Sequence, residues 1–210
     1  MNDIPTEHLN YRITAARFDQ QLDPDEGPAS FVTLMAFELR QADLMVAQVH
    51  ALRINVTLAE EKGYPLAEVF DTVDQDLHEL YCAIYDEKTE AIRDDLAEGA
   101  LGRDVLHIET VKVIPSRRGQ RLGLRFVERL RDLFGGGCAV LTLQAFPLSY
   151  EHSKHPDKID REVFSKGFSA SGDEAKAKLR AYWSQLGLKR VGQTDYMLFD
   201  LSERPPTLAR

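Results

Sequence analysis

The segment 117–123 reads Arg-Arg-Gly-Gln-Arg-Leu-Gly and combines two features that bind phosphate groups, glycines in a loop and clustered arginines. An apolar strand precedes this loop, and a helix follows it directly. Backbone N–H groups at the start of a helix point one way and carry partial positive charge, so they form an anion cradle. Gly119 and Gly123 bring no side chain that would keep a phosphate away from the backbone. Four arginines lie between residues 117 and 125 with no acidic residue among them, which indicates a polyphosphate ligand.

RNA or the acidic face of a protein partner would also attract this arginine cluster, but a loop-to-helix junction favours phosphate. The chain as a whole is acidic, with 26 Lys and Arg against 34 Asp and Glu and a formal net charge of -8. That balance argues against a protein whose whole surface binds nucleic acid or an anionic membrane.

Other residues that could do chemistry give weaker signals. Cys82 and Cys138 form no metal-binding or redox spacing, and His152 and His155 have no third ligand in view, so no metal is expected. The N-terminus lacks the basic start and apolar centre of a secretory signal, and no apolar stretch reaches the roughly 18 residues of a membrane helix. We therefore expect a cytoplasmic protein with neither a nucleic-acid nor a membrane partner.

Apolar periodicity predicts the elements that must position the loop. Alternation predicts a strand over residues 11–18 and an antiparallel hairpin formed by residues 31–40 and 44–56. Helical spacing after Pro65 predicts one amphipathic helix to about Asp86 and a weaker helix over residues 89–98.

The second half of the chain alternates strands with helices. Val105, His107, Glu109, Val111 and Val113 are expected on one face of a strand. The polar stretch 149–172 is too long for an ordinary connection and reads as a lid or a mobile loop. The elements expected here are strand 105–114, helix 122–134, strand 139–146, helix 173–186 and one or two closing strands within 188–201.

The strand and loop resemble motif A of the GNAT superfamily of N-acetyltransferases. In that family a strand ends in V-x-P, and R-x-x-G-x-G/A then opens a helix that grips the pyrophosphate of acetyl-CoA. Val113 and Pro115 match the first pattern, and Arg118 and Gly123 match the second, whereas Arg121 stands in place of its first glycine. The resemblance implies acetyl-CoA as acyl donor, bound by Val111, Val113, Arg118, Gly119, Gln120, Arg121, Leu122 and Gly123.

The resemblance covers about residues 105–201 and implies a fold of the α/β (α+β) class. The expected architecture is a GNAT-like mixed, mostly antiparallel central sheet with helices on both faces. Strand 139–146 is expected to splay from strand 105–114 and to open a slot for the pantetheine arm. A homodimer is compatible with the family. The implied organisation is a single domain over 1–210, with atypical N-terminal strands and helix at 10–100, an acetyl-CoA-binding core at 104–201 and a tail at 202–210.

Acetyl transfer to an amine requires a base, because an alkylammonium is not a nucleophile. Glu109 stands where the family often has an acid, so it is the expected base, directly or through a water molecule. A carboxylate that only orients the substrate or pairs with an arginine is an equal alternative, and His107 is a weaker second candidate for the base. Backbone N–H groups near Val111 and Val113 are the family-like donors for the oxyanion.

The residue that would give a proton to the departing thiolate differs in this sequence from the one that is usual in the family. The family's usual tyrosine lies four residues before the glycine of its L-G-F turn, and Trp183 stands there instead. An indole N–H donates a hydrogen bond but is not a phenol-like acid. Tyr182 is the expected acid if the helix is turned to present it. Tyr196, or departure of the thiolate without help, are the alternatives.

Taken together, these residues predict a GNAT-type N-acetyltransferase that moves an acetyl group directly to a primary amine of a small molecule or peptide. The acidic net charge favours a cationic acceptor. Two alternatives belong to other classes of protein. Arg121 and Trp183 also fit a non-catalytic CoA-binding module for sensing or assembly, and the arginines fit a basic-loop interaction protein with no CoA site.

Overall fold

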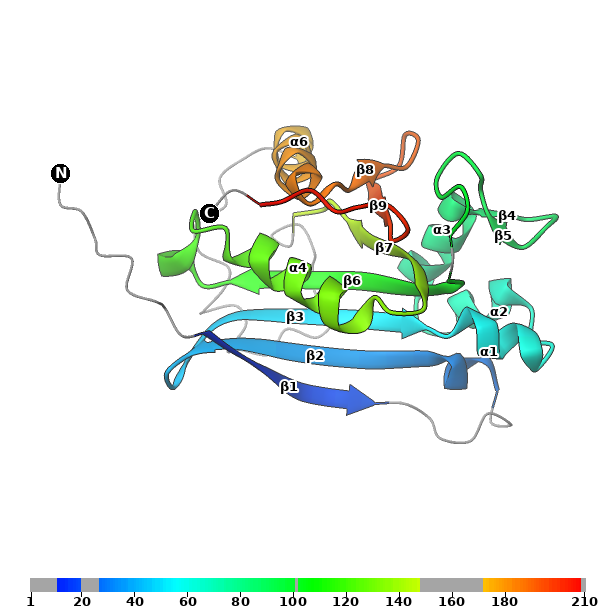
Figure 1. Cartoon of the computed structure of the whole chain (residues 1–210), viewed down its shortest axis with the longest axis horizontal. Coiled ribbons are helices and arrows are strands. Elements are labelled where there is room, and N and C mark those ends of the chain that lie inside the picture. Colours follow the sequence, from blue (N-terminus) through cyan, green and yellow to red (C-terminus); the bar gives the residue numbers. More distant parts are fainter. Residues whose placement is uncertain (1–10, 20–26, 101, 148–171, 209–210) are drawn as a thin grey trace.

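The structure is a computed structural model that describes residues 11–208 except 20–26, 101 and 148–171 (Figure 1). His152, His155 and all but the last residue of the polar stretch 149–172 therefore lie outside the described residues. Within the described ranges, no helix is both long enough and apolar enough to cross a membrane.

The described strands form one seven-stranded sheet in the order β1-β2-β3-β6-β7-β9-β8 (Figure 1). Its neighbouring strands are antiparallel except β6 and β7, which run parallel with α4 between them in sequence. The mixed, mostly antiparallel central sheet predicted from the sequence is thus confirmed. The strands are β1 Tyr11–Asp19, β2 Val32–Gln41, β3 Leu44–Ile54, β6 Asp104–Val113, β7 Cys138–Gln144, β8 Lys189–Arg190 and β9 Tyr196–Asp200.

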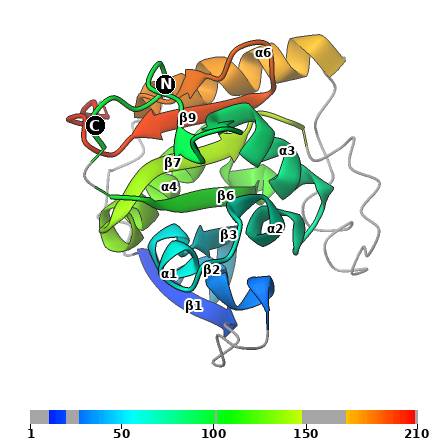
Figure 2. The same cartoon turned by 90° about the vertical axis from the view of Figure 1, so that its right-hand side faces the viewer.

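Helices cover both faces of this sheet (Figure 2). In the first half of the chain, three short helices follow β3, and a two-stranded hairpin of β4 and β5 comes before β6. In the second half, one helix joins β6 to β7 and another precedes β8. The helices are α1 Val56–Glu61, α2 Leu66–Asp71, α3 Gln75–Ile84, α4 Leu122–Phe134 and α6 Gly172–Trp183, and the hairpin strands are β4 Tyr85–Asp86 and β5 Ala91–Ile92.

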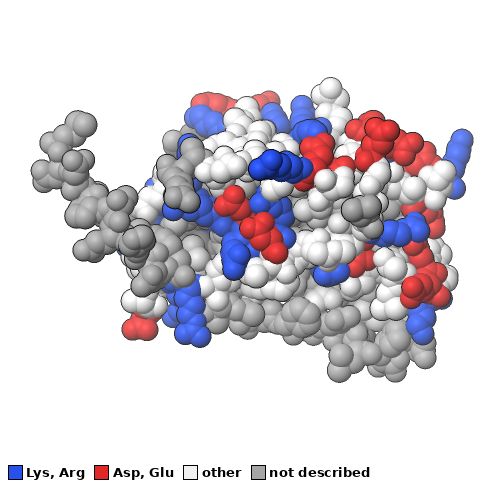
Figure 3. Space-filling view, in the orientation of Figure 1, with Lys and Arg blue, Asp and Glu red and all other residues white. Residues whose placement is uncertain are grey.

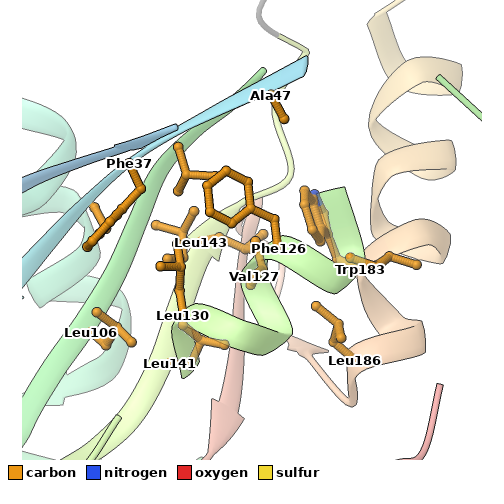
Figure 4. Close-up of a cluster of buried hydrophobic side chains, with 14 of the residues drawn as sticks. Phe37, Ala47, Leu106, Phe126, Val127, Leu130, Leu141, Leu143, Trp183 and Leu186 are labelled. Carbon is orange, nitrogen blue, oxygen red and sulfur yellow. The ribbon is translucent and has the colours of Figure 1, made fainter. Parts of the chain in front are cut away.

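Two apolar cores lie on the two sides of the sheet. On one side, α4 and α6 pack Phe126, Leu130 and Trp183 against inward-facing residues such as Phe37 and Leu143 (Figure 4). On the other side, α1 to α3 pack against the opposite residues of β3, β6, β7 and β9. Both faces of β7 are buried, so this strand reads as a nearly continuous apolar run rather than an alternating one, whereas β6 is fully buried only from Asp104 to Ile108.

The predicted single helix from Pro65 to Asp86 is wrong, since the structure has α2 and α3 in its place. The side chain of Asp74 accepts a hydrogen bond from the backbone N–H of Leu77 at 2.9 Å and caps the start of α3. The extended backbone of Asp74 cannot belong to a helix, so α3 begins after it as a separate helix from α2, which ends at Asp71. A polar residue such as Asp74 fits the exposed face of one long helix as well as the start of a second helix, so periodicity alone did not distinguish the two.

The predicted helix over 89–98 is also wrong. Here the chain forms the β4–β5 hairpin, in which Tyr85 pairs with Ile92 and Asp86 pairs with Ala91. The carboxylate of Asp86 accepts hydrogen bonds from the backbone N–H groups of Lys88 and Thr89 at 2.9 and 3.0 Å. An aspartate bonded to the backbone in this way favours a turn over a helix.

Candidate functional site

The loop between β6 and α4 contains two residues with left-handed backbone conformation. Gly119 has a φ of 78°, and Arg121, the N-cap of α4, has a φ of 57°. Both values lie in the left-handed region, where a residue other than glycine is strained by roughly 1–2 kcal/mol. Arg121 therefore adopts the backbone conformation that a glycine would take there most easily. Its carbonyl accepts the first helical hydrogen bond, from the Arg125 N–H at 3.1 Å.

A β-bulge at Glu109 divides β6 into two halves. His50 of β3 pairs with Thr110, whereas the next residue, Ala51, pairs with Ile108, so the register with β3 skips Glu109. The extra residue moves Val111 onto the face that carries Ile108. The predicted common face of Val105, His107, Glu109, Val111 and Val113 is therefore wrong. Val111 and Val113 pack against the core of α4, and Val105 packs against the opposite core.

Past this bulge, β6 and β7 are no longer paired. The parallel register runs from Asp104 with Cys138 to Ile108 with Leu143, although β6 itself continues to Val113. The Ile114 N–H donates to the Val46 carbonyl of β3 at 3.0 Å. Backbone groups alternate sides along a strand, so those of Val111 and Val113 point away from β3, toward the β7 side. The Val113 carbonyl accepts a hydrogen bond from Arg118 Nε at 3.1 Å, which agrees with that direction.

Tyr182 lies beside the start of α4. Its hydroxyl oxygen accepts a hydrogen bond from the Leu124 N–H at 3.2 Å, one of the first N–H groups of that helix. A Cβ placed on Gly123 would lie 3.0 Å from this oxygen and 3.4 Å from Val111 Cγ1. Burial raises the pKa of Tyr182, while the N–H of Leu124 and the charge of Arg121 act in the opposite direction. The phenol therefore keeps its proton at neutral pH.

The helix α6 is thus turned so that Tyr182, and not Trp183, faces the loop. Trp183 is buried in the core with Phe126 and Leu186 (Figure 4), and its ring meets that of Tyr182 edge to face at 4.9 Å. Tyr196 lies in the core on the opposite side of the sheet and donates its hydroxyl proton to the Asp76 carbonyl at 2.6 Å. Of the two tyrosines considered as acids, only Tyr182 lies beside the start of α4.

His107 is buried beside β7 rather than placed to exchange protons with solvent. Its Nδ1 lies 2.9 Å from Thr142 Oγ1, and burial lowers its pKa to about 4. The imidazole is therefore neutral near pH 7, and a base of so low a pKa gains little from accepting a proton there. Glu109, in contrast, is partly exposed at the bulge.

The arginines of the loop lie at the surface around the start of α4. Arg121 and Arg125 are exposed, and Arg117 and Arg118 are partly buried. Charges of both signs are present on this face of the molecule, and Asp and Glu gather at its right-hand end (Figure 3). In the part of the chain that the structure describes, no group of three His, Cys, Asp or Glu residues is placed to hold a metal ion.

The structure therefore brings Val111, Gly123 and Tyr182 together, beside the part of β6 that lies beyond its last pair with β7. Two further features of this site were not predicted from the sequence, the N–H of Leu124 that donates a hydrogen bond to Tyr182 and the β-bulge at Glu109. The Leu124 N–H follows from its place in the first turn of a predicted helix, whereas no sequence signal marks the bulge. Comparisons of the chain with protein-family models, with curated proteins and with solved structures gave no match in any of the three.

Proposed function

We propose that this protein is an acetyl-CoA-dependent N-acetyltransferase of the GNAT type. The observation that carries the proposal is the end of β6–β7 pairing at Ile108, five residues before β6 itself ends at Val113 and leads into the loop to α4. The residues of β6 beyond Ile108 that are not paired with β7 can offer main-chain N–H and C=O groups to an extended ligand. The left-handed backbone of Gly119 and Arg121 and the start of α4 provide a site for phosphates at the end of the same edge.

In this proposal the chain's own residues divide into two groups. The loop residues Arg118, Gly119, Gln120, Arg121, Leu122 and Gly123 bind the pyrophosphate of the acyl donor, through N–H groups and positive charge. The backbone groups of Val111 and the N–H of Val113 face the pantetheine arm, while the Val113 carbonyl accepts the hydrogen bond of Arg118. The β6–α4–β7 unit is then the acetyl-CoA-binding core of a GNAT-like fold, and the order β1-β2-β3-β6-β7-β9-β8 supports that assignment.

The reaction needs a free amine, an aligned thioester and a proton for the thiolate. Glu109 at the bulge takes a proton from the acceptor ammonium, directly or through water, and the amine attacks the thioester carbonyl. A backbone N–H near Val111 stabilises the oxyanion. The attacking nitrogen, which still carries one proton more than the amide product, releases it to solvent. As the C–S bond breaks, Tyr182 gives its proton to the sulfur, and the phenol then recovers a proton from solvent.

The acceptor in this proposal is a primary amine on a small molecule or a peptide. The formal net charge of -8 favours a cationic molecule over an anionic one in the encounter. A homodimer is compatible with the family and is not required by any step above.

The first experiment is the shift in thermal unfolding with acetyl-CoA, with CoA and with ATP as a phosphate control. A ligand at about 100 times its Kd adds about 2.7 kcal/mol to the free energy of unfolding, which raises the melting temperature clearly. We expect a shift with both CoA species and none with ATP. No shift with either CoA species would overturn the proposal.

A second experiment tests the chemistry rather than the binding. With a library of primary amines and acetyl-CoA, Glu109→Gln should lower turnover by about 100-fold, the usual contribution of a general base. Its Kd for acetyl-CoA should stay close to that of the native chain, because glutamine has nearly the same shape. Unaltered turnover would remove Glu109 from the mechanism.

A second candidate function is a non-catalytic CoA-binding module for sensing or assembly. The observation that favours it is Trp183, which is buried in the core at the position of the family's usual tyrosine. This alternative predicts tight CoA binding with no acetylation of any amine, so turnover of one amine at a useful rate excludes it.

A further inference from the structure

The two short helices α2 and α3 bring a carboxylate, an imidazole and a thiol into a row. His78 and Cys82 are four residues apart on α3, so their side chains lie on the same face of that helix. His78 Nε2 lies 3.7 Å from Cys82 Sγ. On the other side of the ring, His78 Nδ1 lies 3.7 Å from Asp71 Oδ1, at the end of α2.

The tautomer of His78 follows from this arrangement. Nδ1 is shielded from water, has no hydrogen-bond partner within ordinary distance and faces the Asp71 carboxylate. A proton on Nδ1 is favoured there, which leaves the lone pair on Nε2 directed at the thiol. The order of carboxylate, imidazole and thiol is that of an activated cysteine, in which the base takes the proton from sulfur and the carboxylate stabilises the imidazolium.

The surroundings of this row indicate what it reacts with. Residues 68–98 contain eleven Asp and Glu and only two Lys and Arg, a net charge of -9 in a chain whose total is -8. Figure 3 shows the acidic side chains that gather at the end of the molecule where these elements lie. Such a surface attracts cationic reagents and repels anionic ones, with a range of about 10 Å at 0.1 M salt.

We propose that Cys82, with His78 as base and Asp71 as its orienting partner, is a reactive thiol that exchanges with cationic disulfides. The site is separate from the acetyl-transfer site and does not depend on it. His78 Nε2 accepts the thiol proton, and the Cys82 sulfur attacks one sulfur of the disulfide. The S–S bond breaks, a mixed disulfide forms on Cys82, and the departing thiolate takes the proton from His78. The disulfide is the oxidant and is reduced to one thiol.

The second cysteine of the chain is an internal reference for this reaction. Cys82 is exposed, whereas Cys138 is buried and burial raises its pKa to about 11. A buried thiol with a raised pKa is inert, so one cysteine per native chain should react and two after unfolding.

The experiment compares cystamine, a cationic disulfide, with dithiodipropionate, its anionic counterpart, on the full native chain at neutral pH. The rate of mixed-disulfide formation is followed by intact mass, and N-acetylcysteinamide provides the intrinsic reactivity of each reagent. We expect Cys82 to react with cystamine at least about tenfold faster than the free thiol, and the preference over dithiodipropionate to fall as salt is added.

Two matched variants separate the base from the surface charge. Asp71→Asn and Glu79→Gln each remove one negative charge from this surface, but only Asp71 faces His78. His78→Gln should slow the cystamine reaction about tenfold, Asp71→Asn should slow it by a smaller factor, and Glu79→Gln should leave it within about twofold. Circular dichroism checks that each variant is folded.

Three results would overturn the proposal. The first is that Cys82 reacts with cystamine no faster than N-acetylcysteinamide does. Another is a His78→Gln chain that is folded and reacts at the native rate. The third is a Cys82→Ser chain that is still modified in its native state, since the reacting sulfur would then be Cys138.

Discussion

The Tyr182 hydroxyl accepts a hydrogen bond from the Leu124 N–H at 3.2 Å, and this contact ties the end of α6 to the start of α4. The two residues are far apart in the sequence and meet only because α4 and α6 share one face of the sheet. The N–H groups in the first turn of a helix need an acceptor from outside that helix. Tyr182 supplies one acceptor at the place where the proposed function puts the acyl donor.

Replacing Tyr182 by Phe tests both roles of this hydroxyl. The variant leaves the Leu124 N–H without its acceptor, so the free energy of unfolding should fall by about 1 kcal/mol. If Tyr182 is the acid, turnover of the best amine should fall by about 10- to 100-fold. Denaturant unfolding and steady-state kinetics measure the two effects.

Trp183→Phe is the control for this variant. Trp183 lies in the core and its replacement by the smaller ring leaves a cavity, so stability should fall. Phenylalanine keeps an aromatic ring in that core and beside Tyr182, so α6 should keep its rotation and the Tyr182 hydroxyl its place. Turnover per folded molecule should then remain near the native value. Equal turnover of Tyr182→Phe and Trp183→Phe would contradict the assignment of Tyr182 as the acid.

Gly123→Ala should weaken acetyl-CoA binding with little loss of stability. Alanine at this helical position gains up to about 1 kcal/mol in helix propensity. Its Cβ would lie 3.0 Å from the Tyr182 hydroxyl and 3.4 Å from Val111 Cγ1, so it enters the space between α4 and β6. We expect at least about a tenfold higher Kd by calorimetry, which is about 1.4 kcal/mol of binding free energy.

The matched control is Gly172→Ala at the start of α6, where an added Cβ would meet nothing within 4 Å. It should leave the Kd unchanged. A Gly123→Ala chain that binds acetyl-CoA as tightly as this control would show that the ligand does not approach the first turn of α4.

How much of this site could be predicted depends on the kind of interaction that builds it. The loop and α4 follow from local signals, since the glycines and arginines of 117–123 lie between a strand and an apolar stripe of helical period. The bulge at Glu109, in contrast, does not follow from local signals in the sequence. Inserting one residue changes which face Val111 takes, and that depends on the pairing of β6 with β3, residues 47–54. No local pattern contains that register.

The choice between Tyr182 and Trp183 has the same origin. Neighbouring residues on a helix point about 100° apart, so the rotation of α6 decides which ring faces the loop. That rotation is set by packing of Trp183 in a core that includes Phe126 of α4, a distant segment of the chain. A sequence can state both alternatives, as it does here, and only the tertiary contacts choose one.

Asp74→Ala tests why the predicted long helix is divided. The variant removes the acceptor of the Leu77 N–H, and an alanine at a helix N-cap costs about 1 kcal/mol of stability. Asp74→Asn keeps a side-chain oxygen at the cap and should remain within about 0.5 kcal/mol of the native chain. Equal unfolding free energies for the Ala and Asn variants would show that this cap does not stabilise α3.

His107 should make the stability of the protein depend on pH in the acidic range. The imidazole has its pKa lowered by burial from 6.5 to about 4, so between these values the unfolded chain binds a proton that the folded chain does not. Stability therefore falls as the pH decreases from 6.5 toward 4, by up to about 3 kcal/mol from this group.

His107→Gln cannot titrate and keeps a partner for Thr142 Oγ1, so its unfolding free energy should fall less over the same range. Thr142→Ser keeps both the imidazole and a hydroxyl and should show the native slope. Urea unfolding at several pH values gives all three curves, and parallel curves for the native chain and His107→Gln would mean that the imidazole is protonated in the folded state.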